Sequence, residues 1–181
     1  MKKIFIISSF FIGGILSAQN SDAKISVTEI QNQFKYKKYS TEILTKFVNE
    51  IGEVEQVPYV TEFIPGEIIG WNNDRSSYSS EEIFCIKNNE LKMISTIPED
   101  ETFWNKLNQK APKNYKFSFE NYGRAREAKS IKKSKNGNFI LNSEVYLYEE
   151  NEESNPSKIY KIEYQTKDFK NFTLKKLSKT K

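Results

Sequence analysis

Histidine is absent from this chain of 181 residues, and cysteine occurs only once. Without an imidazole, Ser-His-Asp and Cys-His catalysis and histidine-ligated metal sites are excluded. A single cysteine also excludes an intramolecular disulfide and every metal site that needs several thiolates. Cys85 lies between Phe84 and Ile86, which favours a small buried side chain. A free thiol that reacts or pairs with another chain stays open as the alternative.

Glycine is also scarce. The seven glycines form neither a phosphate-binding loop nor a dinucleotide fingerprint, so we expect no nucleotide and no other cofactor. Residues 72–83 begin with oxygen ligands at alternate positions, but Ser77 and Ile83 stand where a calcium loop needs glycine and glutamate. We therefore expect no metal site.

The N-terminus has the layout of a secretory signal peptide. Two lysines precede an apolar run, from Ile4 to about Ala18, which serines and glycines interrupt. This run is shorter than the roughly 20 residues that span a bilayer. We expect cleavage near Ala18, so that residues 1–18 are removed. The product would begin at Gln19 and be periplasmic or secreted, and not an integral membrane protein once processed.

Charge is nearly balanced over the whole chain, with 28 basic and 24 acidic residues, but it is unevenly placed. Residues 19–109 hold 9 basic and 15 acidic residues, a net charge of −6. Residues 110–181 hold 17 and 9, a net charge of +8. Such asymmetry indicates a polar interface or a basic face.

Apolar residues recur at helical spacing in three segments. Residues 22–39 predict a short helix, and residues 97–109 predict another with acids in its first turn. The pattern is clearest over residues 40–52, where Ser40 can cap the start of a helix and Gly52 can end it.

Elsewhere the apolar residues alternate, as half-buried strands require. A hairpin is predicted over residues 81–95, with the two asparagines Asn88 and Asn89 in its turn. The other predicted strands cover residues 57–63, 66–71, 114–120, 124–135, 138–149, 157–166 and 170–177.

Helices followed by many strands indicate an α+β fold. We expect a single domain over residues 19–181, with one or more N-terminal helices packed on one face of a mostly antiparallel, meander-rich β-sheet. In outline this arrangement resembles cystatin-like and nuclear-transport-factor-like folds. The resemblance is one of architecture, and such folds host unrelated functions.

The segment 123–137 carries six basic residues and one acid, and either binds an anionic partner or forms the solvated side of a strand. Asn136-Gly137 predicts a hairpin with a two-residue loop, because both positions of such a turn need positive φ. The numbers of opposed residues should then sum to 273. This register places Arg124 opposite Glu149.

The same register places Lys129 opposite Glu144, and each such pair of opposite charges contributes roughly 0.2–1 kcal/mol. The partner strand therefore accounts for much of the basic segment. Unpaired charge remains near the hairpin tip, on Lys132, Lys133 and Lys135. An acidic polysaccharide, a lipid surface or an acidic protein would suit it. We expect no nucleic acid partner, since an exported protein meets little of it.

The loop 70–80 is the segment most typical of a binding site. It presents Trp71 and Tyr78 on either side of Asp74 and Arg75, and aromatic residues and arginine often anchor recognition surfaces. In the alternative interpretation, the loop is a long hairpin connection whose aromatic side chains fold inward and whose two charges pair.

Eliminating these catalytic constellations favours an exported, non-catalytic binding module that recognises a protein, peptide or glycan. An inhibitor-like or immunity-like protein belongs to this class. A carboxylate-dependent hydrolase of an envelope or extracellular polymer is the first alternative, because two acids need only meet in space. A structural envelope component is the second. The sequence assigns no catalytic residue.

Overall fold

The computed structural model describes residues 25–34, 38–52, 59–72, 82–152 and 155–180. The predicted signal peptide lies outside these ranges. The helices are α1 (Val27–Phe34), α2 (Thr41–Ile51) and α3 (Glu101–Asn108). The strands are β1 (Tyr59–Ile64), β2 (Ile68–Asn72), β3 (Glu82–Lys87), β4 (Glu90–Ile94), β5 (Tyr115–Ser118), β6 (Glu120–Asn121), β7 (Arg124–Ala125), β8 (Ser130–Lys133), β9 (Phe139–Glu149), β10 (Lys158–Thr166) and β11 (Phe172–Lys179).

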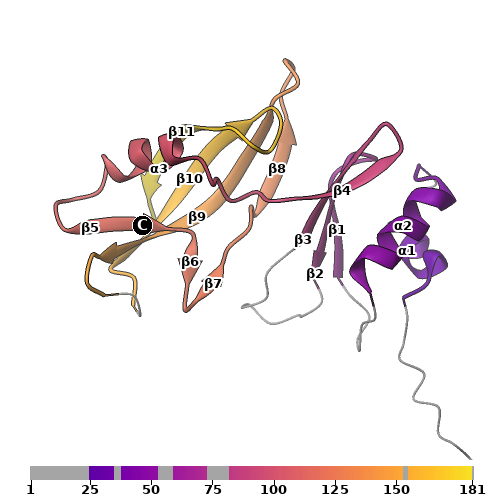
Figure 1. The fold of residues 1–181 in the computed structure, drawn as a ribbon, viewed down its shortest axis with the longest axis horizontal. Helices are drawn as coiled ribbons and strands as arrows, with labels where there is room; N and C mark the ends of the chain where they lie inside the picture. The colour runs from indigo at the N-terminus through magenta and orange to yellow at the C-terminus, as the bar shows by residue number, and fades with distance from the viewer. Residues whose placement is uncertain (1–24, 35–37, 53–58, 73–81, 153–154, 181) are drawn as a thin grey trace, which may run out of the picture.

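The described strands form two principal antiparallel sheets and a small hairpin (Figure 1). The first sheet has the order β1-β2-β3-β4. The second has the order β11-β10-β9-β5, with β8 also paired to β9, and β6 pairs with β7. The predicted α+β class with antiparallel pairing is therefore confirmed. The strands are divided between two sheets, a feature that alternation cannot reveal because it identifies strands but not their partners.

The predicted ends of α2 and the predicted turn between β3 and β4 agree with the structure. Helix α2 begins after Ser40, whose Oγ accepts a hydrogen bond from the backbone N–H of Ile43 at 3.3 Å, and it ends at Gly52 with φ 69°. The β3–β4 hairpin turns at Asn88 and Asn89, whose φ angles of 52° and 64° suit a two-residue turn.

The first sheet is apolar on both faces. Phe47 of α2 contacts Trp71 and Phe84 edge-on, with ring centroids 6.0 Å and 5.0 Å apart. Ile68 and Ile83 point the other way, into a hydrophobic core that they share with the second sheet. This core therefore joins the two sheets.

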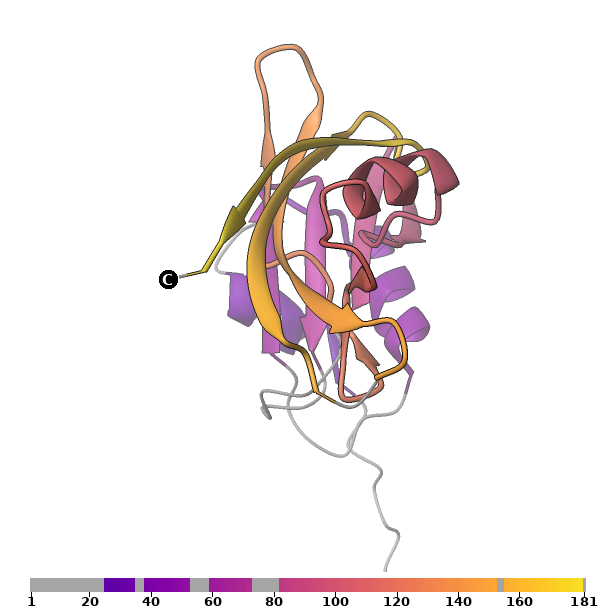
Figure 2. The ribbon, with the colours of Figure 1, turned by 90° about the vertical axis from the view of Figure 1, so that its left-hand side faces the viewer.

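The second sheet is curled, and α3 lies on its concave side (Figure 2). Phe103 and Leu107 of α3 are buried in the shared core together with Leu141 of β9 and Tyr164 of β10. Strand β8 lies beside β1 of the first sheet. The two sheets thus meet along this line, which positions the groove described below.

The β8–β9 hairpin corrects the predicted register. Its loop holds three residues, 135–137, because the N–H of Ser134 bonds to the carbonyl of Asn138 at 2.8 Å. Lys133 lies opposite Phe139, so the residue numbers of each pair sum to 272. The physical reason is that Gly137 takes positive φ, at 82°, whereas Asn136 does not. A three-residue loop with glycine at its last position results.

Only one of the two predicted charge pairs forms, because the predicted strand 124–135 is divided: β8 begins at Ser130, and residues 124–125 pair with β6 instead of β9. Lys129 still forms an ion pair with Glu144, with Nζ 2.6 Å from Oε2. Arg124 does not face Glu149: it lies opposite Asn121 in the β6–β7 hairpin. Glu149 lies opposite Tyr115 instead.

Candidate functional groove between the sheets

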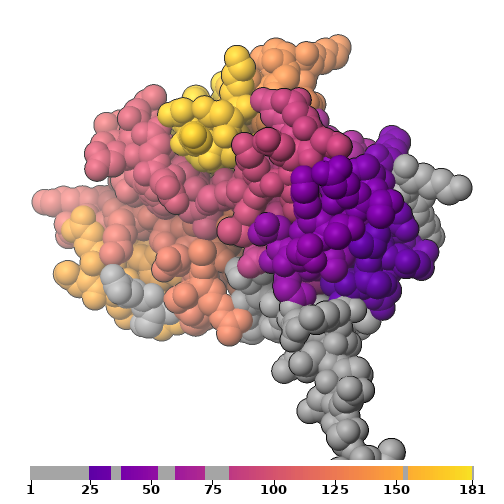
Figure 3. All heavy atoms as spheres, turned by 45° about the vertical axis from the view of Figure 1, so that its right-hand side comes forward, coloured from indigo at the N-terminus to yellow at the C-terminus, as the bar shows by residue number. Residues whose placement is uncertain are grey.

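A groove with a volume of about 600 Å³ lies where the two sheets meet. Its apolar wall consists of Cys85 and Ile94 from the first sheet and Phe139 and Phe169 from the second. The two phenylalanine rings stack at a tilt of 37°, with centroids 4.7 Å apart. In Figure 3 the segments around it, the β3–β4 hairpin (magenta), the β10–β11 turn (yellow) and the β8–β9 tip (orange), gather at the upper side of the molecule.

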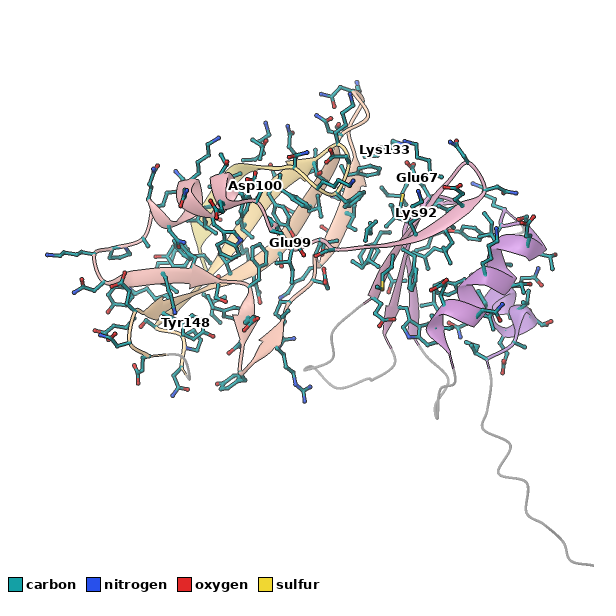
Figure 4. All side chains as sticks on the ribbon, in the orientation of Figure 1. Glu67, Lys92, Glu99, Asp100, Lys133 and Tyr148 are labelled. Atoms are coloured by element: carbon teal, nitrogen blue, oxygen red, sulfur yellow. The ribbon has the colours of Figure 1, made fainter. Side chains whose placement is uncertain are left out.

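Charged side chains surround this apolar wall, and two of its lysines are neutralised. Lys133 Nζ lies 2.7 Å from Glu67 Oε2, so an ion pair joins β8 to the β1–β2 turn (Figure 4). The same ammonium lies 5.4 Å from the centroid of the Phe139 ring. Lys92 pairs with Glu90 at 3.2 Å.

Two further lysines of the groove have no such partner. Among the described residues, neither Lys87 nor Lys167 makes an ion pair. The neighbouring acid, Asp168, accepts hydrogen bonds from the backbone N–H groups of Asn171 and Lys170, which lower its pKa to about 2. Asp168 is therefore ionised at neutral pH and cannot serve as a proton-donating acid.

Cys85 is half-buried on the wall of the groove. Burial raises the pKa of its thiol, and the charge of Glu67 raises it further, against an opposing influence from three nearby lysines. Its protonated form is thus favoured, and only the thiolate is a strong nucleophile. The side chain contributes apolar surface to the groove.

Of the predicted hairpin-tip lysines, the structure brings only Lys133 into this groove. Lys132 lies opposite Ile140, next to the Lys133–Phe139 pair. Because adjacent strand residues point to opposite faces, Lys132 is directed away from the groove. Lys135 is exposed in the loop.

The predicted loop site is only partly covered by the described residues. Trp71 is 2% exposed and packs against Phe47, so its side chain is part of the core, as the inward-folding alternative proposed. Asp74, Arg75 and Tyr78 lie in residues 73–81, outside the described part of the chain. Their assignment as binding residues stays a prediction.

Sequence reasoning did not find a buried polar network around Glu127. Its carboxylate accepts hydrogen bonds from the hydroxyl and the backbone N–H of Thr96, the latter at 3.2 Å. The same hydroxyl oxygen accepts from the N–H of Ala128 at 2.9 Å, and Tyr164 donates to the Thr96 carbonyl at 2.9 Å. This network holds the segment between β4 and α3, which connects the two sheets, against β10.

Apart from Lys133, the charged residues of the groove were also missed, because they are far apart in the chain. Glu67, Lys87 and Lys167 come from three separate turns or strand ends. Each resembles an ordinary solvated charge when it is viewed alone. The sequence does show lysines beside several predicted turns. This pattern does not indicate which of those turns lie together in the fold.

The fold and this groove define an α+β protein with two antiparallel sheets and a charged groove at their junction. No family model, curated protein or solved structure matches the chain. Within the described ranges, none of the helices has the length and apolar character needed to span a membrane.

Proposed function

We propose that this chain is an exported, non-catalytic binding module, and that the groove between the sheets is its recognition site. Its ligand is a protein segment, peptide or glycan that presents an apolar surface next to an anionic group. The apolar part contacts Phe139 and Phe169, and the anionic group is attracted by Lys87 and Lys167.

The combination of an apolar wall with two lysines that make no ion pair with any described residue carries this proposal. Ligand sites are typically concave, mostly apolar and about 300–1,000 Å³ in volume, with a few polar groups that fix orientation. The Lys133–Glu67 ion pair supports a pre-formed site, because it holds the two sides of the groove together.

Two further elements belong to the proposal. The lysines and apolar run at the N-terminus support export of a product that begins at Gln19. The contacts of Phe47 support an arrangement in which α1 and α2 cover one face of the first sheet. That face would then be closed to ligands, and the opposite face, which packs on the shared core, would be accessible where the groove opens.

The test is capture of a partner from the envelope fraction and culture medium of the source organism. The mature chain from Gln19 is compared with Lys87→Glu/Lys167→Glu, and bound material is identified by mass spectrometry. We expect one dominant ligand, with affinity at least tenfold lower for the double variant, because charge reversal repels the anionic group. Tenfold corresponds to about 1.4 kcal/mol.

A matched control is Lys113→Glu/Lys158→Glu, which makes the same change in net charge at exposed lysines outside the groove. It should retain the ligand as well as the wild-type chain. Equal retention by the groove variant would show that the ligand binds elsewhere, and turnover of the captured material would contradict the non-catalytic assignment.

A further inference from the structure

A second hollow, of about 510 Å³, lies between α3 and β11 and shares no residue with the groove. Four lysines line it: Lys106 from α3, Lys110 from the turn that follows α3, and Lys175 and Lys176 from β11. No acidic residue lines it. In this respect it differs from the groove, where acids alternate with lysines.

An irregularity in β11 brings two of these lysines together. Glu163 of β10 lies opposite Lys176, and the next residue, Tyr164, lies opposite Leu174. Lys175 is therefore an extra residue without a partner on β10, as in a β-bulge. Bulges redirect side chains and are often functional. Here the irregularity allows two consecutive residues of one strand to line the same hollow.

None of these four lysines forms an ion pair within the part of the chain that the structure describes. Lysines on an edge strand protect it from pairing with other strands, and β11 is such an edge. That role explains Lys175 and Lys176. It does not explain why Lys106 and Lys110 of a different element converge on the same place. Charge of one sign in a concave surface raises the local concentration of anions.

We propose that this hollow binds an acidic polysaccharide through its carboxylate, sulfate or phosphate groups. Leu174 and Leu177 line the hollow but are partly buried against the core, so they offer no projecting anchor for a membrane. The lining contains no aromatic ring on which a nucleic acid base could stack. The bulge and the lysines of β11 oppose addition of a peptide strand.

The test measures binding of the mature chain to two probes, dextran sulfate and polygalacturonate, with neutral dextran as the uncharged control. The variant is Lys110→Gln/Lys175→Gln, which removes one charge from each side of the hollow. The matched control, Lys113→Gln/Lys158→Gln, removes the same charge at lysines that line neither the hollow nor the groove. All four side chains are exposed, and thermal melting confirms that both variants are folded.

We expect the wild-type chain to bind at least one acidic probe and not neutral dextran, with affinity falling as salt is raised. The hollow variant should bind at least fivefold more weakly, and the control variant less than twofold more weakly. An equal loss of affinity in both variants would show that binding depends on the net charge of the protein and not on the hollow. Absence of binding to both acidic probes, or binding only to phosphatidylglycerol vesicles, would overturn the proposal.

The groove variant Lys87→Glu/Lys167→Glu should retain more affinity for these probes than a hollow variant of equal charge change, Lys110→Glu/Lys175→Glu.

Discussion

Thr96 is a single buried residue that forms hydrogen bonds with three other residues of the fold. It is fully buried in the connection between β4 and α3, and its hydroxyl contacts both Glu127 and the N–H of Ala128. Its carbonyl accepts the hydrogen bond of Tyr164. A short connection between two sheets is thereby fixed at three points, and the N–H, hydroxyl and carbonyl of Thr96 all have partners.

Glu127 makes the stability of the protein depend on pH in a specific direction. Burial raises the pKa of this carboxyl above its usual value of 4.5, although hydrogen bonds from Thr96 act in the opposite direction. The folded state therefore favours the protonated form. This contribution to stability is present below the unfolded pKa and is lost as the pH rises through the folded pKa.

We expect Glu127→Gln, which is neutral at every pH, to remove this loss. The melting temperature of the variant relative to the wild type should therefore increase between about pH 4 and pH 7. Each unit by which the pKa of Glu127 is raised corresponds to about 1.4 kcal/mol. Glu90→Gln, at an exposed residue, is the control. A difference in melting temperature that stays constant with pH would contradict this assignment.

At the scale of elements, turn chemistry decided which predictions were correct. Asn88 and Asn89 both accept positive φ, so the two-residue turn of β3–β4 was predicted correctly. In the β8–β9 hairpin only Gly137 adopts positive φ, and the loop gains a residue. The same short motif can form either loop, because Asn136 accepts both conformations, and tertiary contacts such as Lys133 with Glu67 accompany the three-residue form.

Gly137→Ala tests the positive φ that the structure gives to Gly137 in this loop. An added Cβ would meet no atom within 4 Å, so Gly137→Ala changes only the backbone preference at φ 82°. We expect the free energy of unfolding to fall by about 1–2 kcal/mol, measured by urea denaturation. Lys135→Ala, at an exposed position of the same loop, should change it little. An unchanged stability of Gly137→Ala would contradict the positive φ of Gly137.

At the scale of the whole molecule, the sequence predicted local structure better than the site. Capping residues and alternation identified α2, α3 and most strands, because these signals depend on neighbouring residues. Division into two sheets depends on contacts between distant segments, such as Ile68 with the core around Leu141. The groove exists only after this division, so its residues could not be grouped from sequence.

The uneven distribution of charge along the sequence is partly reflected in the two proposed sites. The hollow between α3 and β11 draws three of its four lysines from residues 110–181, the basic part of the chain. The groove combines residues from the acidic and basic parts, and it contains acids and lysines together. The two proposed sites therefore differ in charge, and their ligands should differ in the same way.

Mapping the captured ligand onto the protein by NMR tests the central claim most directly. The ¹⁵N-labelled mature chain is titrated with that ligand, and changes in amide chemical shifts are followed. We predict that the largest changes cluster around Lys87, Phe139 and Phe169, on three segments that line the groove. Largest changes on the β5–β9 face around Tyr148, with the groove amides unchanged, would contradict the account.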